Sequence, residues 1–335
     1  RITNPYITIA GQTAPGDGIL IATEGIALSG GVSDVIVRYL RIRRSFDKVK
    51  WADYIGNPAH TTPNPEGDCL GGLNVKGNVM FDHVSTSWGT DENLSIYRRK
   101  INGKVVPIKN ITIQWCVSSE ALNPANHAFG GTWGGQGGNY HHNLFACNTG
   151  RNPSLSFSHF LDYRNNVIFN WQHRTMDGAG YEAHVNVINN YYKPGPATYS
   201  GALKVRIVKP EIRSWSGTFD QPTPKDVAYA GPGVIGSLDV NCNVVEGYPE
   251  VSNDNWAGKS IVSGNYYTGV QWDSDVQPYP GFGPNLGEYH PEWEGETMED
   301  HPEWAKADTV ITYAEWPENP YDPEDGTDGG MFVMP

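Results

Sequence analysis

The stretch NYHHN at residues 139–143 returns as DYRNN at 162–166 and as NVINN at 186–190, each time ending in asparagine. Four earlier segments share its alternation of β-branched or aromatic residues with other residues: ITIAG (7–11), VIVRY (35–39), VMFDH (79–83) and ITIQW (111–115). With the last residue of each segment placed in one column, the steps along the chain are 28, 44, 32, 28, 23 and 24 residues. Repetition on this scale is typical of solenoid proteins, in which the longer steps carry loop insertions.

The repeats predict short strands without intervening helical periodicity, which favours an all-β parallel β-helix over an α/β fold. We expect this domain to cover residues 1–278, with long loops and an N-terminus that looks truncated. Asn143, Asn166 and Asn190 are expected to stack at one bend, each amide bonding to the next along the axis. A β-sandwich would also contain short strands, but it would not predict an aligned asparagine column.

The net charge of −13 is concentrated at the C-terminus of the 335-residue chain. Residues 285–335 hold 14 Asp and Glu against the single Lys306, so the first 284 residues are neutral. The charge therefore does not exclude an acidic substrate for the main domain. We expect residues 279–335 to form an extended, acidic, Pro- and Trp-rich segment that packs on the solenoid.

The four cysteines are far apart and form no C-x-x-C pair, which excludes a zinc motif and gives little support for disulfides. We expect Cys69, Cys116, Cys147 and Cys242 to be small buried hydrophobic residues.

Acidic residues cluster between positions 66 and 92. Glu66 and Asp68 are two positions apart, so they point to the same side of an extended strand, and Asp91 and Glu92 follow about one turn later. Carboxylates from neighbouring turns can converge on a hard cation such as Ca²⁺. From spacing alone, surface acids without a ligand remain the alternative.

Several segments, in order, resemble the polysaccharide lyase family 1 pectate lyases, and more narrowly the bacterial and fungal branch that includes pectate trisaccharide-lyases. They are ITIAGQTAPGDGI, VMFDHVSTSWGTDENLSI, HAFGGTWGG, YHHNLFACNTGRNP, DYRNNVIFNW and NVINNYYKPGPAT. The resemblance extends from residue 1 to about residue 200 and implies a right-handed parallel β-helix.

The resemblance also implies a reaction, calcium-assisted β-elimination on polygalacturonate or a related uronate polymer. A base removes the C5 proton, the C4–O bond breaks, and a cation neutralises the uronate carboxylate so that the enolate-like transition state is stabilised. Arg151 matches the first arginine of the family's R-x-P-x-x-R motif and is the implied catalytic base. Since arginine normally stays protonated, a role as carboxylate clamp is the alternative.

The implied metal ligands are Asp68, Asp91 and Glu66. The family's further aspartate is replaced by Ser95 and its second arginine by Ser156, and no assisting lysine precedes His127. We therefore expect weak calcium binding that is completed by water and substrate.

Arg174, Lys193 and His127 are the candidate substrate-binding residues, each with a structural or solvated role as the alternative. The glycines of FGGTWGG, after His127, are expected to let a sugar chain approach the backbone. His83, His141, His142 and Asp82 are interpreted as core or ladder residues.

Two functions from different classes follow. The first is a pectate lyase, an enzyme of pectin degradation that is secreted, periplasmic or displayed at the cell surface. Its partner would be an acidic polysaccharide, with no nucleic acid and no membrane span, and the chain would be a monomer. The second is a non-catalytic β-helix that binds polysaccharide or serves as an adhesin. A β-helical polygalacturonase would need an aspartate cluster for hydrolysis that Asp82, Asp91 and Glu92 do not obviously provide.

Overall fold

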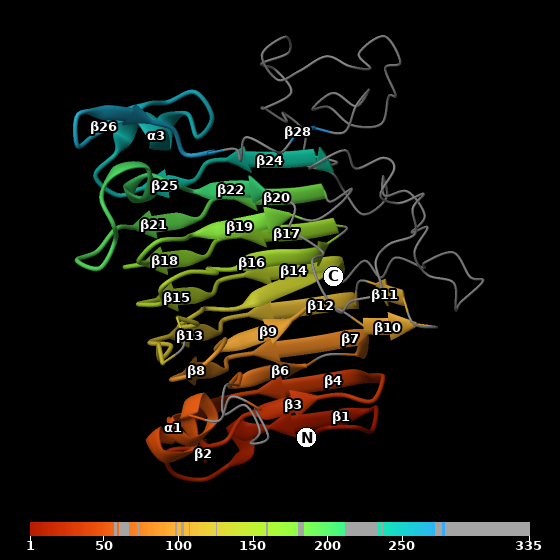
Figure 1. Ribbon diagram of the computed structural model, residues 1–335. Helices are drawn as coiled ribbons and strands as arrows, with labels where there is room; N and C mark the ends of the chain where they lie inside the picture. The colour runs from red at the N-terminus through yellow and green to blue at the C-terminus, as the bar shows by residue number, and fades with distance from the viewer. Residues whose placement is uncertain are drawn as a thin grey trace.

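The computed structural model is a parallel β-helix, as the repeats predicted, with short strands stacked along one axis (Figure 1). It describes residues 1–56, 59, 67–72, 74–97, 99–101, 104–106, 108–124, 126–158, 160–179, 184–211, 234–235, 237–271 and 277–278. The expected acidic segment 279–335 lies outside these residues.

Three rows of parallel strands run along the axis, and rows A and B are joined into one 14-stranded sheet by the long β14. Row A contains β3 (Ile26–Leu28), β6 (Leu70–Gly72), β9 (Leu94–Ile96), the start of β14 (Thr132–His141), β16 (Ser154–Ser158), β19 (Met176–Ala179) and β22 (Val208–Glu211). Row B contains β1 (Ile7–Ala10), β4 (Val32–Arg38), β7 (Val75–Asp82), β12 (Lys109–Gln114), the rest of β14, β17 (Phe160–Arg164), β20 (His184–Ile188) and β24 (Ser237–Asn241). Row C contains β2 (Ile19–Thr23), β5 (Leu40–Arg44), β8 (Ser85–Ser87), β13 (Val117–Ser119), β15 (Leu144–Ala146), β18 (Val167–Phe169), β21 (Tyr191–Lys193) and β25 (Val244–Val245).

The asparagine ladder lies at the bend from row B to row C. The Nδ2 of Asn143 donates to Oδ1 of Asn166, and the Nδ2 of Asn166 donates to Oδ1 of Asn190, both at 3.0 Å. Asn243 and Asn255 extend the ladder beyond the predicted members. Each amide also bonds to the backbone, so the bend keeps its polar groups satisfied although it is buried.

The predicted column needs a correction of one residue in this bend. Gln114 pairs with His141, so Trp115 aligns with His142, and Asn143 aligns with Cys116 instead. Trp115 belongs to a stack of aromatic and histidine rings on the outer surface of this bend. In this stack the Tyr39 and His83 ring centroids are 4.4 Å apart, and those of Trp115 and His142 are 4.3 Å apart. His83 and His142 are therefore ladder residues of the surface rather than of the core. Strand alternation alone does not fix such a register.

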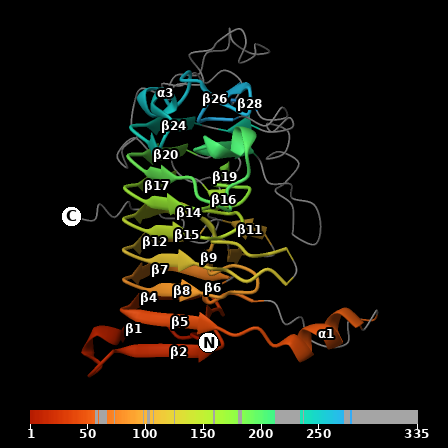
Figure 2. The same cartoon turned by 90° about the vertical axis from the view of Figure 1, so that its left-hand side faces the viewer.

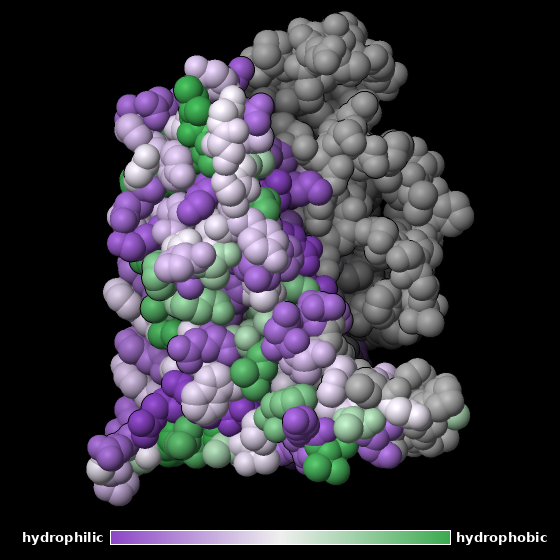
Figure 3. Space-filling view, turned by 60° about the vertical axis from the view of Figure 1, so that its left-hand side comes forward, coloured by the Kyte–Doolittle hydropathy of each residue, from purple (hydrophilic) through white to green (hydrophobic). Residues whose placement is uncertain are grey.

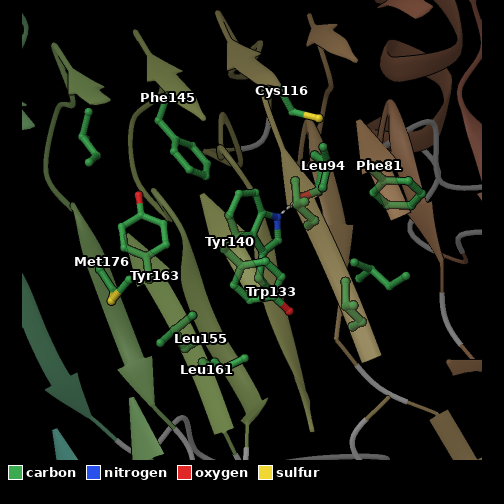
Figure 4. Packing of buried hydrophobic residues seen from close by; sticks show 14 of the residues in the cluster. Phe81, Leu94, Cys116, Trp133, Tyr140, Phe145, Leu155, Leu161, Tyr163 and Met176 are labelled. Atoms are coloured by element: carbon green, nitrogen blue, oxygen red, sulfur yellow. Dashed lines mark hydrogen bonds between the residues drawn. The ribbon is translucent and has the colours of Figure 1, made fainter. Parts of the chain in front are cut away.

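The core is the space that the three rows enclose. Trp133 packs against Tyr140 and Phe145, with both ring centroids 4.9 Å away, and its Nε1 donates to the Leu94 carbonyl at 2.9 Å (Figure 4). Burial of each such side chain stabilises the fold by about 1.5–3 kcal/mol. Phe81 and Tyr163 continue the apolar filling along the axis.

The remaining elements are insertions and terminal structure. They are η1 (Gly11–Thr13), α1 (Lys48–Gly56), the β10–β11 hairpin (Arg99–Ile101 and Lys104–Val106), η2 (Gly201–Lys204), β23 (Val234–Ile235), α3 (Pro249–Asn253), β26 (Ser260–Val262), β27 (Asn265–Tyr267) and β28 (Gln277–Pro278). Within the described part of the chain, no helix is long and apolar enough to cross a membrane.

On the face drawn in Figure 3, hydrophobic side chains are scattered among hydrophilic ones. The four cysteines are free. Cys69 and Cys116 are buried as expected, whereas Cys147 and Cys242 are exposed.

Candidate functional site

The candidate residues gather where row C leads into row A, which we call the C-to-A corner. The connections at this corner precede β6, β9, β14, β16 and β19, and they carry Asp68, Asp91 with Glu92, His127, Arg151 and Arg174 in that order. Because successive strands of a sheet are about 4.8 Å apart, these side chains form a series along the axis.

Three carboxylates converge in this series. One oxygen from each of Asp68, Asp91 and Glu92 can be chosen so that all lie within 4.8 Å of one another. The backbone N–H of Glu92 also donates to Oδ1 of Asp68 at 3.2 Å, which ties the two turns together. Oxygen donors in an irregular arrangement suit a hard divalent cation such as Ca²⁺, so the residues present fit the expected metal. We call this group the acidic cluster.

The electrostatics of the acidic cluster point the same way. Burial, and then the negative charges of Glu92 and Asp91, raise the pKa of Asp68 well above its ordinary value of 3.8. In the metal-free protein, the negative charge of ionised Asp68 is therefore not balanced by enough nearby positive charge. A bound cation would supply that charge.

Sequence reasoning brought Asp68 and Asp91 into the metal set but did not choose Glu92. The third residue predicted there, Glu66, lies outside the described residues. The signal for Glu92 was its position next to Asp91 in a tight connection, where strand alternation does not apply. A connection of this kind lets two adjacent side chains serve one site.

Glu92 also contacts the candidate catalytic residue. Its Oε1 accepts a hydrogen bond from the guanidinium of Arg151 and another from Oγ1 of Thr132, the latter at 2.9 Å. The guanidinium carbon of Arg151 lies 4.1 Å from the centre of the Phe129 ring. An ion pair on one side and a cation–π contact on the other therefore fix the position of the guanidinium.

The backbone explains how Arg151 reaches this position. Its φ is 51°, a left-handed conformation that costs a residue with a Cβ about 1–2 kcal/mol. Its carbonyl accepts from the N–H of Gly131 at 2.9 Å, and the N–H of Asn152 donates to Thr175 at 3.0 Å. Bonds to both neighbouring turns therefore hold the tight turn in which Arg151 stands.

Arg174 follows Arg151 by one turn, since Arg151 precedes β16 and Arg174 precedes β19. Its guanidinium carbon lies 5.4 Å from the same Phe129 ring, and its Nη1 lies 2.9 Å from Oδ2 of the buried Asp177. Phe129 thus serves as a common surface for two arginines from consecutive turns. No sequence signal had marked Phe129 as part of the site.

His127 contributes to the acidic side of the site. Its Nδ1 lies 3.1 Å from Oδ1 of Asp91, and its ring packs against Phe129 with centroids 5.1 Å apart. His127 is therefore a neighbour of the acidic cluster and of Phe129, the ring that both arginines also contact.

Lys193 lies at some remove from this series. It is in β21 of row C, and its Nζ is 2.9 Å from Oε1 of Glu246 on a later turn. Among the described contacts, none joins Lys193 to Arg151, Arg174 or the acidic cluster.

Ser95, which stands where the family has a further aspartate, has a structural role in the fold. Its Oγ accepts the backbone N–H of Thr132 at 2.9 Å, so it joins two strands of row A.

The FGGTWGG glycines have a different role from the one expected. A Cβ at Gly131 would lie 1.8 Å from the Leu94 carbonyl oxygen, and one at Gly134 would lie 1.9 Å from that of Ser156. Close packing between turns of the solenoid requires glycine at these positions. Access of a sugar to the backbone does not explain them.

The fold and the site together define a class: a parallel β-helix in which a carboxylate cluster suited to a cation and two arginines that share the Phe129 ring lie at one corner. No protein-family model matches the chain. The sequence is, however, similar to fungal proteins named "Probable pectate lyase C". It is 37% identical to that of Aspergillus flavus over 205 residues, 59% of this chain and 41% of the relative.

The match to the protein of the same name from Neosartorya fischeri is longer. It shows 32% identity over 274 residues, which is 79% of this chain and 53% of the relative. The Aspergillus fumigatus protein is 35% identical over 203 residues, 59% of this chain and 41% of the relative. The chain thus spans about half the length of the curated relatives it matches.

Proposed function

We propose that the chain is a pectate lyase β-helix that cleaves polygalacturonate, or a related uronate polymer, by calcium-assisted β-elimination. The observation that carries this proposal is the contact between Glu92 of the acidic cluster and the guanidinium of Arg151. A cation site and an arginine that share one carboxylate are suited to act together on an anionic sugar. The similarity to proteins named probable pectate lyase C supports the choice of substrate.

Substrate binding in this proposal depends on charge. Bound calcium would neutralise the uronate carboxylate and so make the C5 proton more acidic. Arg174 stands one turn beyond Arg151 and would hold the next carboxylate of the polymer. It would thereby take over the role of the family's second arginine, whose position is occupied by Ser156 in this chain. The ring of Phe129 contacts both guanidinium groups and would keep them in position.

Arg151 is the residue that we propose acts at C5. In the resting arrangement the contacts with Glu92 and Phe129 hold its guanidinium in place. If Glu92 served the cation as a ligand, the guanidinium of Arg151 would lie close to the bound ion and to the uronate carboxylate that the ion would hold. His127 would keep Asp91 oriented for the same cation.

Localisation and domain extent follow from the same proposal. A protein that acts on plant cell-wall polymer would be secreted or displayed at the cell surface. We also propose that residues 1–278 form the lyase domain and that 279–335 are an extension of it.

The identity of the products tests the proposal against its alternatives. The protein is incubated with polygalacturonate and Ca²⁺, and the masses of the oligosaccharide products are measured by mass spectrometry. A lyase gives an unsaturated uronate at each new non-reducing end. A hydrolase gives fragments heavier by one water, and a non-catalytic binding protein leaves the polymer intact. Either of the last two results would contradict the proposal.

A further inference from the structure

The first connection at the C-to-A corner that leads to the acidic cluster is much longer than its neighbours. It runs from the end of β5 at Arg44 to the start of β6 at Leu70, and it contains α1. Figure 2 shows α1 projecting away from the body of the solenoid. The helix therefore packs little against the core that stabilises the other elements.

Both ends of this connection are anchored beside the acidic cluster. At its start, the N–H of Ser45 donates to the Thr23 carbonyl at 3.2 Å. At its end, the N–H of Gly67 donates to Oγ1 of Thr90 at 3.1 Å, next to Asp91. Arg44 joins the two ends, because its Nη1 donates to the Asp68 carbonyl at 3.3 Å. The two ends of this connection therefore lie next to the turn that carries Asp68.

The connection presents aromatic and aliphatic surface to solvent. Trp51 is half-buried between Phe46 and Tyr54, with ring centroids 6.3 Å and 5.9 Å away. Phe46 is 37% exposed and Val49 is 79% exposed. Adjacent aromatic rings on a projecting element are a common sign of a binding surface, and their flat faces suit the C–H faces of a sugar ring.

The segment that carries these rings has a net positive charge. Residues 41–56 contain five Arg and Lys against Asp47 and Asp53, a net charge of +3, whereas the first 284 residues as a whole are neutral. Of these cations, Lys50 is paired with Asp47, with Nζ 3.6 Å from Oδ2. Arg43 and Arg44 bind the backbone of neighbouring turns, whereas Lys48 and Lys50 are exposed on α1 itself. Aromatic surface combined with lysines favours an anionic polymer over a neutral one.

We propose that α1 and residues 41–47 form a distal subsite for an anionic polysaccharide, in which Trp51 packs on a uronate ring beyond the acidic cluster. The polymer would run along the C-to-A corner from Arg174 past Arg151 and Asp68 to α1. The inference rests on the proposed function for the identity of the sugar. It adds that long chains bind better than short ones.

Calorimetry with oligogalacturonates of three and of ten residues tests the subsite, in excess EGTA to prevent cleavage. Wild-type protein should bind the longer chain more tightly. Trp51→Ala should weaken binding of the longer chain about fivefold and leave the trimer unchanged. Trp115→Ala is the matched control, an exposed tryptophan at the bend from row B to row C, and it should alter neither affinity. Both variants should have the same melting temperature as the wild type, because neither side chain is part of the solenoid core.

Three results would overturn the subsite: equal wild-type affinity for both lengths, no effect of Trp51→Ala on the longer chain, or an equal loss for both lengths. The proposed function fails separately. If no unsaturated product forms but Trp51→Ala still weakens binding of the longer chain, the subsite stands on a non-catalytic protein. If product forms and Trp51→Ala changes no affinity, the lyase stands and the subsite does not exist.

Discussion

Replacement of Arg151 by lysine is expected to lower kcat on polygalacturonate at least about a hundredfold while the fold is retained. Lysine keeps the positive charge, so Glu92 stays neutralised and the buried pair is not broken. It loses the planar guanidinium that packs 4.1 Å from the Phe129 ring and presents paired donors. Steady-state kinetics and a thermal melt on the same preparation measure both effects.

Arg164→Lys is the matched control for this variant. Arg164 is also paired with an acid, at 2.6 Å from Asp162, but it stands in β17 of row B, away from the corner. We expect its kcat to equal that of the wild type. A lower melting temperature with unchanged turnover in Arg151→Lys would mean that Arg151 only closes the turn before Pro153.

Replacement of Asp68 by asparagine is expected to abolish calcium binding and to lower activity at least about a hundredfold, without destabilising the metal-free protein. The pKa of Asp68 is raised by burial and by the charges of Glu92 and Asp91, so ionisation of this side chain is unfavourable in the folded state. Asparagine removes that charge. Its Oδ1 can still accept the N–H of Glu92.

The sign of the pH dependence follows from the raised pKa. Between the ordinary value of 3.8 and the higher folded value, the folded protein binds more protons than the unfolded one. The stability that protonated Asp68 contributes is therefore complete below the ordinary value. It is lost as the pH rises through the folded value.

In EGTA, the melting temperature of the wild type should therefore fall relative to that of Asp68→Asn as the pH increases from about 4. Added Ca²⁺ should raise the melting temperature of the wild type but not that of Asp68→Asn. Asp17→Asn, at an exposed position, should follow the wild type throughout. A metal-free Asp68→Asn protein that melts below the wild type at neutral pH would contradict the assigned electrostatics.

The sequence predicted the fold because its signal is repetitive. Asn143, Asn166 and Asn190 follow one another at 23 and 24 residues, which is one turn of the solenoid without insertion, and their amides do form one ladder. Asn243 was not recognised as the next member, because a 53-residue step with a long insertion separates it from Asn190. The slip at Trp115 arose because alternation repeats every two residues and does not mark where a bend begins.

The site was less predictable, since its decisive contacts join residues that are far apart in sequence. Glu92 and Arg151 are 59 positions apart, and no spacing rule connects them. Their contact depends on the parallel bridges that Phe129 makes to Glu92 and to Gly150. The place of Asp68 and Asp91 on consecutive turns was accessible from the period alone. The acidic partners of Arg151 and Arg174, which are Glu92 and Asp177, could be identified only from the fold.

The most direct test of the account is the calcium dependence of product formation by the wild-type chain. Ultraviolet absorbance of the unsaturated uronate is followed on polygalacturonate, first in excess EGTA and then after Ca²⁺ is restored. The account predicts no product in EGTA and a recovered rate once Ca²⁺ exceeds the chelator. Unsaturated product at the same rate in EGTA would contradict the role of the acidic cluster, and the absence of product under both conditions would contradict the lyase itself.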